Sequence, residues 1–355
     1  MSDGPCASCP DAANENQGAV YNSLPLVSVV IGNWNRLDDL KRAVGSVRKQ
    51  VWPPERTEIV VVDNQSTDGS IEWCRHQKDI RLIITRLDLG ASVMLDTGFM
   101  SSKGDYVVCM DNDAELDPTY IANAITIFGG WDKGINFFDD TEMAPEITDY
   151  VNRGYKLGCL TPNMMKGDRK TKDLKAGLFR EEMFDVNLQF HGAACVFKRE
   201  AGDKVGWYNP DYYLYDNEVD LGARLFKAGY LTMYCPMLVA YHHISNVNRV
   251  RPRLLYYAIR HYYWFIWEHL PFPLAVYQTL LWAAWSVMSA WRYPKTLIMS
   301  HLSAWIRMPW VFIRRQPITD EFMMKPWRPN IRKEFNLARW WELIRGEKSF
   351  GTDVK

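Results

Sequence analysis

The chain has 355 residues, of which 47% are hydrophobic and 24% are charged. This composition excludes a wholly disordered chain, and the length allows one large domain with an appendage. Residues 1–248 carry 25 Lys and Arg against 35 Asp and Glu, whereas residues 249–355 carry 17 against 7. An acidic front and a basic rear exclude a uniformly basic nucleic-acid-binding protein, so we expect no nucleic acid among its partners.

Three regions follow from the pattern along the chain. Residues 1–23 are polar and predict a disordered tail, residues 24–248 predict a domain, and residues 249–355 predict a helical, basic, Trp-rich extension. Within the domain, apolar runs at 27–31, 58–62, 81–87 and 105–110 predict buried strands, and the segments between them have helical spacing. This alternation predicts an α/β fold with a doubly wound, mostly parallel sheet. Residues 130–185 show no pattern and are interpreted as irregular, and residues 218–228 predict a further helix.

Polar residues follow every predicted strand. Ligands of open parallel sheets bind beyond the carboxyl ends of the strands, so these residues outline one acidic crevice. Two carboxylates one residue apart after a buried strand repel each other, and a divalent cation with oxygen ligands relieves that cost. A solvated turn is the alternative. The residues are Asn33 and Arg36, then Asp63, then Asp88, and finally Asp111, Asn112 and Asp113.

A second acidic group precedes the helix predicted at 218–228. Asp216, Glu218 and Asp220 exceed what helix capping needs, so one of them, with Glu218 first, is a candidate general base for an acceptor hydroxyl. Further along, Tyr241-His242-His243 follows an apolar run, and at most one of the two histidines is placed to join a metal site. The alternative for the acids is a capping role, and for the histidine a structural one.

Residues 26–243 resemble the catalytic domain of family 2 glycosyltransferases, which have the GT-A fold. The resemblance rests on ordered motifs, among them Val61-Val62-Asp63-Asn64, Asp96-Thr97-Gly98, Asp111-Asn112-Asp113 and Asn217-Glu218-Val219-Asp220. It is nearest in style to bacterial rhamnosyl- and galactofuranosyltransferases of surface-polysaccharide synthesis. The resemblance implies a nucleoside-diphosphate sugar as donor, with UDP or dTDP favoured. Its binding residues would be Asn33, Arg36, Asp63, Asp88, Asp96, Asp111 and Asn112.

The same resemblance implies a mechanism. Asp111, Asp113 and His242 would hold Mn²⁺ or Mg²⁺, and Glu218 would act as the base of an inverting displacement, although the family usually has Asp there. Asp216 and Asp220 are the fallbacks. The acceptor, a glycan or polyprenyl-linked hydroxyl, is expected near His191, Gly192 and Tyr212. Two alternatives are an inactive membrane-associated scaffold of the same fold and a nucleotidyltransferase, for which a Gly- and Lys-rich phosphate loop would be needed.

The extension mixes tryptophans and basic residues. Residues 270–291 contain no charged residue and are long enough to span a bilayer, but the prolines and polar residues in this stretch favour helices that lie in the headgroup layer. We therefore expect residues 254–315 to contact a membrane surface. A soluble helical subdomain and a spanning helix are the alternatives. Together with the absence of a secretory signal, this predicts a cytoplasmic protein, peripheral on the inner face of the plasma membrane.

Overall fold

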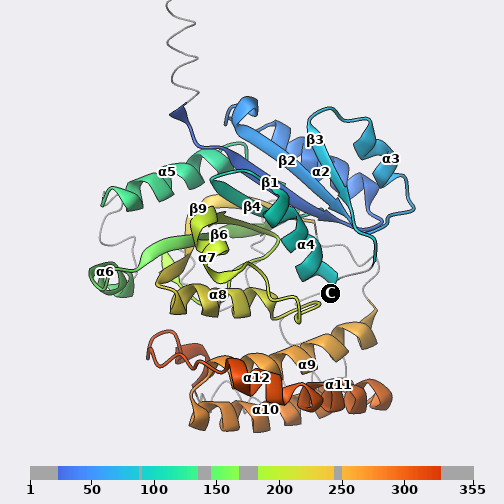
Figure 1. The fold of residues 1–355 in the computed structure, drawn as a ribbon, viewed down its shortest axis with the longest axis vertical. Helices are drawn as coiled ribbons and strands as arrows, with labels where there is room; N and C mark the ends of the chain where they lie inside the picture. Colours follow the sequence, from blue (N-terminus) through green and yellow to red (C-terminus); the bar gives the residue numbers. More distant parts are fainter. Residues whose placement is uncertain (1–22, 88–89, 135–144, 168–182, 244–249, 329–355) are drawn as a thin grey trace, which may run out of the picture.

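The computed structural model describes residues 23–87, 90–134, 145–167, 183–243 and 250–328 (Figure 1). The tail expected over residues 1–23 thus lies outside the described residues, apart from Ser23. The strands of one sheet lie between residues 27 and 242. Its strands are β1 (Val27–Asn33), β2 (Thr57–Asp63), β3 (Ile80–Ile84), β4 (Tyr106–Asp111), β5 (Ala114–Leu116), β6 (Lys156–Lys166), β7 (Asp185–Val186), β8 (Ala194–Lys198) and β9 (Tyr230–His242).

The strand order β3-β2-β1-β4-β8-β6-β9-β5 confirms the predicted sheet. Strands β3, β2, β1 and β4 are parallel neighbours, as are β6 and β9, whereas β8 runs antiparallel between β4 and β6. All seven residues of β1 are buried, which explains why its sequence is mostly apolar and does not alternate with exposed polar residues. Helices cover both faces: α2 (Leu37–Arg48), α3 (Ser70–Arg75), α4 (Gly90–Ser101), α5 (Tyr120–Asp132), α6 (Pro145–Asn152), α7 (Arg199–Val205) and α8 (Asn217–Lys227).

The irregular segment predicted at 130–185 is wrong for its middle part. Helix α6 and the eleven-residue strand β6 both lie there, and β6 is a central strand of the sheet. Register shifts at Leu157/Cys159 and Pro162/Asn163 interrupt its pairing with β9. Because a bulge breaks the two-residue period of a strand, the sequence pattern of β6 is not that of a regular strand. Residues 135–144 and 168–182 lie outside the described residues.

In the described part of the extension, residues 250–328, four α-helices form a layer beneath α8 (Figure 1). They are α9 (Arg251–His269), α10 (Phe272–Ala290), α11 (Pro294–Ile306) and α12 (Met308–Arg314). Helix α9 is the buried centre of this layer, with side chains such as Ile259, Phe265 and Ile266 inaccessible to solvent. Its neighbours α10, α11 and α12 all pack against it, and α8 contacts it from the other side.

Two observations in this layer bear on the predicted membrane-contacting segment. Helix α9 contributes little surface, so the first part of the membrane-contacting segment predicted at 254–315 is instead a core helix. Among the described residues, no helix is both long and apolar enough to cross a bilayer. The division into regions at 1–23, 24–248 and 249–355 stays a prediction.

Candidate active site

The carboxyl ends of β1, β2 and β4 are joined by a row of side-chain hydrogen bonds. Asn33 donates to the Asp63 carboxylate at 2.8 Å, and Asn112 donates to the Asn33 carbonyl oxygen at 2.8 Å. The backbone amide of Ser66 binds the other Asp63 oxygen at 2.7 Å. Parallel pairing of Asn33 with Asp63 brings these groups to one edge. Asp63 is fully buried, so in this structure its carboxylate fixes the loop after β2, and its contact with a nucleotide base stays a prediction.

Asp111, Asp113 and His242 meet at the same edge. Their potential ligand atoms all lie within 4.8 Å of one another, and His242 Nε2 is 3.3 Å from Asp113 Oδ1. Residue Ala114 of β5 pairs with His242 of β9, which places the histidine beside the turn that carries Asp113. Carboxylate and imidazole ligands at such distances fit a divalent cation such as Mn²⁺ or Mg²⁺. The predicted trio of metal-ligating residues is therefore assembled by strand pairing.

The electrostatics of this trio also fit a cation. Desolvation in the crowded crevice raises the pKa of Asp111 to about 6, and the neighbouring Asp113 carboxylate adds to the rise. Two neighbouring carboxylates repel each other when both are ionised, and a bound divalent cation would relieve this repulsion. Arg36 already offers one positive charge, because its Nη1 lies 2.7 Å from Asp113 Oδ2. Asp113 thus directs one oxygen toward Arg36 and the other toward His242.

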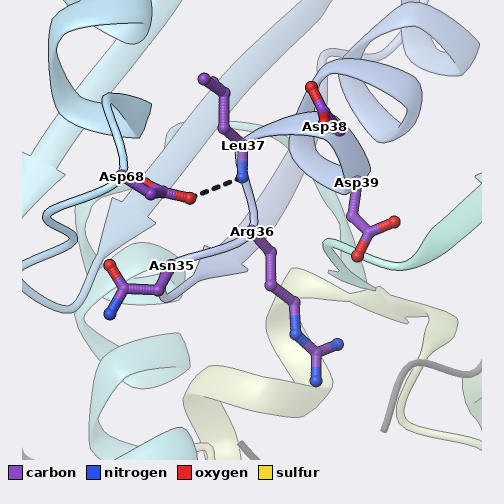
Figure 2. A pocket seen from close by; sticks show the side chains of 6 residues that line it. All are labelled: Asn35, Arg36, Leu37, Asp38, Asp39 and Asp68. Atoms are coloured by element: carbon purple, nitrogen blue, oxygen red, sulfur yellow. Dashed lines mark hydrogen bonds between the residues drawn. The ribbon is translucent and has the colours of Figure 1, made fainter. Parts of the chain in front are cut away.

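Arg36 extends from the shallow pocket shown in Figure 2. The pocket lies where β1 gives way to α2, and Asp68 closes it by accepting a hydrogen bond from the Leu37 amide at 2.8 Å. Asp68 also accepts a hydrogen bond from the amide of Ser70, the first residue of α3, at 3.1 Å. The Asp68 carboxylate therefore binds the first backbone amide of both α2 and α3. The pocket is lined by Asn35, Arg36, Leu37, Asp38, Asp39 and Asp68.

Glu218 lies beside the metal-ligating trio. A Cβ added to Gly192 would be 2.7 Å from Glu218 Oε1, so the carboxylate rests against the backbone at 192. That backbone is fixed to β4, because Asp111 donates its amide hydrogen to the Ala193 carbonyl at 2.9 Å. The charge of Glu218 also contributes to the raised pKa of Asp111. Chain segments about 100 residues apart thus bring the candidate base and the candidate metal site together.

Glu218 owes its position to a strained start of α8. Tyr215 and Asp216 both have positive φ, at 65° and 57°, an uncommon conformation for residues other than glycine. Such strain persists only where surrounding structure holds it, and it gathers at functional sites. Asp216 occupies the N-cap position of α8, but its side chain makes no capping hydrogen bond, so capping does not account for this acid. The rings of His191 and His242 lie 5.6 Å apart, which places His191 beside the candidate metal site and next to the glycine that contacts Glu218.

Two other candidates, Asp96 and Tyr212, lie differently from expectation, and the placement of a third is not described. Asp88 lies outside the described residues. Asp96 accepts a hydrogen bond from the Tyr208 amide at 2.9 Å, and burial raises its pKa to about 6, so it ties α4 to the chain before α8. Tyr212 is fully buried and packs edge-on against Trp264 of α9. Tyr212 therefore joins the domain to the extension and does not line an acceptor region.

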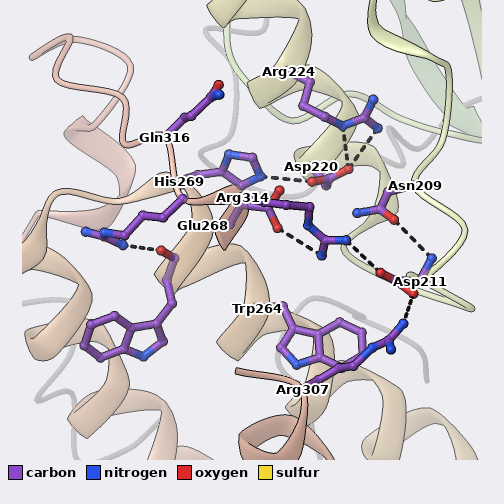
Figure 3. A network of polar contacts seen from close by, with 12 residues as sticks. Asn209, Asp211, Asp220, Arg224, Trp264, Glu268, His269, Arg307, Arg314 and Gln316 are labelled. Carbon is purple, nitrogen blue, oxygen red and sulfur yellow. Dashed lines mark hydrogen bonds and ion pairs between the residues drawn. The ribbon is translucent and has the colours of Figure 1, made fainter. Parts of the chain in front are cut away.

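Asp220 also faces the extension. It is fully buried, its Oδ2 binds Arg224 at 2.9 Å and its Oδ1 lies 2.9 Å from His269 Nε2 (Figure 3). Burial by itself would raise the pKa of Asp220, but Arg224 and the hydrogen bond from His269 hold it low, at about 2. A carboxylate enclosed in this way cannot reach an acceptor in the crevice. Its candidate role as general base is corrected to a structural one, in which it forms an ion pair with Arg224.

A buried ionic network extends from Asp220 across the contact with the extension (Figure 3). His269 Nδ1 lies 3.0 Å from the ammonium of Lys227, so neutral His269 accepts there and donates through Nε2 to Asp220. A second branch joins Glu268 to Arg314, and Arg314 and Arg307 both bind Asp211. Sequence reasoning missed this network because its partners are 40 to 100 residues apart and share no local spacing.

The network predicts a pH-dependent stability. Burial lowers the pKa of His269 to about 4, whereas an unfolded histidine titrates near 6.5. Between these values the unfolded chain binds the extra proton, so this residue's contribution to the free energy of unfolding falls as pH drops from 6.5 to 4, by about 3 kcal/mol at most. The variant His269→Gln keeps a donor for Asp220 but does not titrate.

Chemical unfolding of both proteins between pH 4 and 7 measures this difference. Glu268 opposes the trend, because burial raises its pKa to about 7 and the folded chain then binds its proton more tightly. The quantity to compare is therefore the free energy of unfolding of wild type minus that of His269→Gln, because the Glu268 contribution cancels in this difference. A difference that does not change with pH would show that His269 is not held neutral.

Comparison with known proteins agrees with this fold. Residues 28–135 match the family model described as glycosyl transferase family 2. The N-acetylglucosaminyl-diphospho-decaprenol L-rhamnosyltransferase of Mycobacterium tuberculosis is 23% identical over 211 residues, which cover 53% of this chain and 67% of that protein. These matches favour glycosyl transfer over the nucleotidyltransferase alternative.

Two solved structures share the fold over nearly the whole chain. A mannosyltransferase from Pyrobaculum calidifontis, solved with GDP-Man and Mn²⁺, has a TM-score of 0.53 at 17% identity and covers 94% of this chain and 91% of its own. S. aureus TarS has a TM-score of 0.53 at 14% identity, with 93% and 94% covered. Both likenesses confirm the GT-A type of sheet with a C-terminal helical region.

Proposed function

We propose, from the premise that this chain is a family 2 glycosyltransferase, that it moves a sugar from a nucleoside-diphosphate donor to a hydroxyl of a lipid-linked glycan. One observation carries the proposal: Asp111, Asp113 and His242 form a compact group beside Glu218. A cation site next to a candidate base, beyond the strand ends, has the parts that this transfer needs.

The donor side would be held by the acids and amides of the strand ends. Asp111, Asp113 and His242 would ligate Mn²⁺ or Mg²⁺, which when bound would offset the charge that develops on the leaving diphosphate. Support for a divalent cation comes from the donor set and from the Mn²⁺ in the Pyrobaculum structure. Asn33 and Asn112 would hold the ends of β1 and β4 together through their side-chain hydrogen bond, and Arg36 would face the phosphates. We favour UDP or dTDP as the nucleotide.

On the acceptor side, Glu218 would take the proton of the attacking hydroxyl. The new bond forms between the acceptor oxygen and the anomeric carbon as the bond from that carbon to the diphosphate breaks. Attack from the face opposite the leaving group inverts the configuration. The half-buried Glu218 is suited to this role because the chain at 191–192 keeps one side of its carboxylate away from solvent. His191 and Gly192 would border the acceptor.

The acceptor would be carried by a polyprenyl lipid in the synthesis of a surface polysaccharide. Support comes from the Mycobacterium relative, whose name describes transfer to a sugar on a decaprenyl diphosphate. An enzyme that uses such a lipid works at a bilayer surface. We therefore propose a peripheral location on the inner face of the plasma membrane.

A ligand screen tests the proposed function. The full chain is heated with UDP, dTDP, GDP or CDP in the presence of Mn²⁺, Mg²⁺ or EDTA, since a ligand that binds only the folded state raises the unfolding temperature. We expect UDP or dTDP to raise it only with a divalent cation, and the corresponding nucleotide sugars to be hydrolysed slowly. The proposal fails if none of the four nucleotides stabilises the protein with either cation.

Gly192→Ala tests the contact between Glu218 and the chain at 192. The added Cβ would lie 2.7 Å from Glu218 Oε1 and would push the carboxylate out of place. Displacement of a reacting group by about 1 Å can cost 10²-fold, so we expect the turnover number to fall about 10- to 100-fold. Gly129→Ala on α5 is the matched control, because nothing lies within 4 Å of its Cβ. Initial rates on the donor identified by the screen measure both; equal rates would contradict the placement of Glu218.

A further inference from the structure

The extension exposes an unusual number of large apolar side chains. Of the 21 large hydrophobic residues that are exposed within the described ranges, 13 lie between residues 272 and 313. They are concentrated on the three helices that pack on the side of α9 away from α8 (Figure 1). Apolar surface on this scale marks an interaction site in a soluble protein. The residues are Phe272, Val276, Leu280, Val287 and Trp291 on and after α10, Ile298, Met299, Leu302, Trp305 and Ile306 on α11, and Trp310, Phe312 and Ile313 on α12.

These side chains form stripes at helical spacing. On α10 the exposed residues recur every three or four positions once Ala284 is included, and the buried residues Ala275, Gln278 and Trp285 mark the opposite face, which packs inward. On α11 the inward face carries Ser300 and Ala304. On α10 and α11 the outer face thus carries large apolar residues, and the buried residues are small or polar apart from Trp285. A helix that only covers a core instead has polar residues on its outer face.

The charge of this surface selects the partner. Residues 270–319 contain no Asp or Glu but contain Arg292, Lys295, Arg307, Arg314 and Arg315. Arg307 and Arg314 form ion pairs with Asp211, and Arg315 donates to backbone carbonyls at the end of α9 and just after it. Arg292, in the short turn after α10, and Lys295, in the first turn of α11, are both exposed, and the Arg292 guanidinium lies over the Trp291 ring.

We infer that the outer faces of α10, α11 and α12, defined by the 13 residues above, are a docking surface for an anionic lipid bilayer. The apolar side chains would enter the boundary between headgroups and acyl chains, the exposed tryptophans would lie at headgroup level, and Arg292 and Lys295 would bind lipid phosphates. A second copy of the chain fits less well. In a two-fold contact the same basic, acid-free surface would meet itself, with no carboxylate to balance its cations.

The surface gives the proposed location a physical basis, and it bears on the site as well. Helix α12 carries Arg307 and Arg314, which bind Asp211 in the chain that leads into α8. These ion pairs connect the helices of the extension to the chain segment that leads into α8, the helix that carries Glu218. A bilayer bound to this surface would hold the crevice at a fixed height above lipid-linked acceptors. This inference rests on the proposed function for its purpose, but its test requires neither donor nor acceptor.

Vesicle sedimentation tests the docking surface. The full chain is mixed with vesicles of phosphatidylcholine alone or with 30% phosphatidylglycerol, a fraction of about this size being chosen to give a clearly negative surface. The double variant Ile306→Glu/Ile313→Glu changes side chains that are 75% and 74% exposed. Its matched control is Met100→Glu, at a side chain that is 76% exposed on α4, away from the extension. Thermal unfolding checks that all proteins fold.

We expect wild type and Met100→Glu to bind the anionic vesicles, with a blue shift of tryptophan fluorescence. We expect the double variant to bind at least tenfold more weakly, and Arg292→Glu/Lys295→Glu to lose the preference for phosphatidylglycerol. Three outcomes would overturn the inference: no binding to anionic vesicles, equal binding by wild type and the double variant, or a dimer that the double variant dissociates without any vesicle binding. Failure of the nucleotide screen alongside vesicle binding would overturn only the proposed function.

Discussion

Asp113→Asn is expected to abolish the cation-dependent stabilisation by UDP or dTDP and to lower turnover by about 10³-fold. Asp113 presents one oxygen to His242 and the other to Arg36, so it links the candidate metal site to the only arginine that reaches it among the described residues. Replacing the carboxylate by an amide removes a negative ligand and leaves the Arg36 charge unbalanced. A loss of about 4 kcal/mol in stabilisation of the transition state corresponds to this rate.

Two measurements separate loss of the metal from loss of the fold. Titration with Mn²⁺, followed by its electron paramagnetic resonance signal, reports binding without turnover, and thermal unfolding of the unliganded protein reports folding. Asp38→Asn is the control, because this acid lies in the nearby pocket but its side chain is 95% exposed. If Asp113→Asn binds Mn²⁺ as tightly as wild type, Asp113 is not a ligand, and Asp111 with His242 would have to account for any metal site.

The part of this site that could be predicted from the sequence is the part made by parallel strands. Parallel neighbours bring their carboxyl ends to one edge, so an acid after each apolar run is sufficient to predict that Asn33, Asp63 and Asp111 meet. His242 was predictable for the same reason, because it ends the apolar strand β9. No contact between side chains had to be known for these assignments.

Other features could not be predicted because packing decides them. Asp216, Glu218 and Asp220 lie within five residues of one another, and the sequence alone does not tell which way each side chain points. In the structure α8 turns Glu218 toward Gly192 and Asp220 toward His269, so one acid serves the crevice and the other the extension. Tyr212 was misplaced for the same reason, since only the docking of α9 shows that it is buried.

Glu218→Gln is expected to lower turnover by 10²- to 10⁴-fold while nucleotide binding stays intact. The amide has nearly the shape of the carboxylate, so the contact with Gly192 and the start of α8 are kept, but it cannot accept the acceptor proton. The stabilisation of the protein by nucleoside diphosphate and Mn²⁺ should equal that of wild type. This combination distinguishes a general base from a residue that only supports the fold.

The comparison with Asp220→Asn sharpens the test. Asp220 is paired with Arg224 and His269 and has no access to the crevice, so loss of its charge should lower the free energy of unfolding by about 3 kcal/mol or more, because it leaves the Arg224 guanidinium without its buried carboxylate. Glu218→Gln should instead leave the unfolding temperature within a few degrees of wild type. Glu72→Gln on the exposed side of α3 is the neutral control for both.

The remaining alternative, an inactive scaffold, makes the opposite prediction for this pair. A scaffold would bind nucleotide without turning it over, so wild type and Glu218→Gln would be equally inactive on every nucleotide sugar. An active wild type with an inactive but nucleotide-binding Glu218→Gln fits only the base. Partial recovery in Glu218→Asp would further show that a carboxylate is required, since the shorter side chain keeps the chemistry and loses the contact at Gly192.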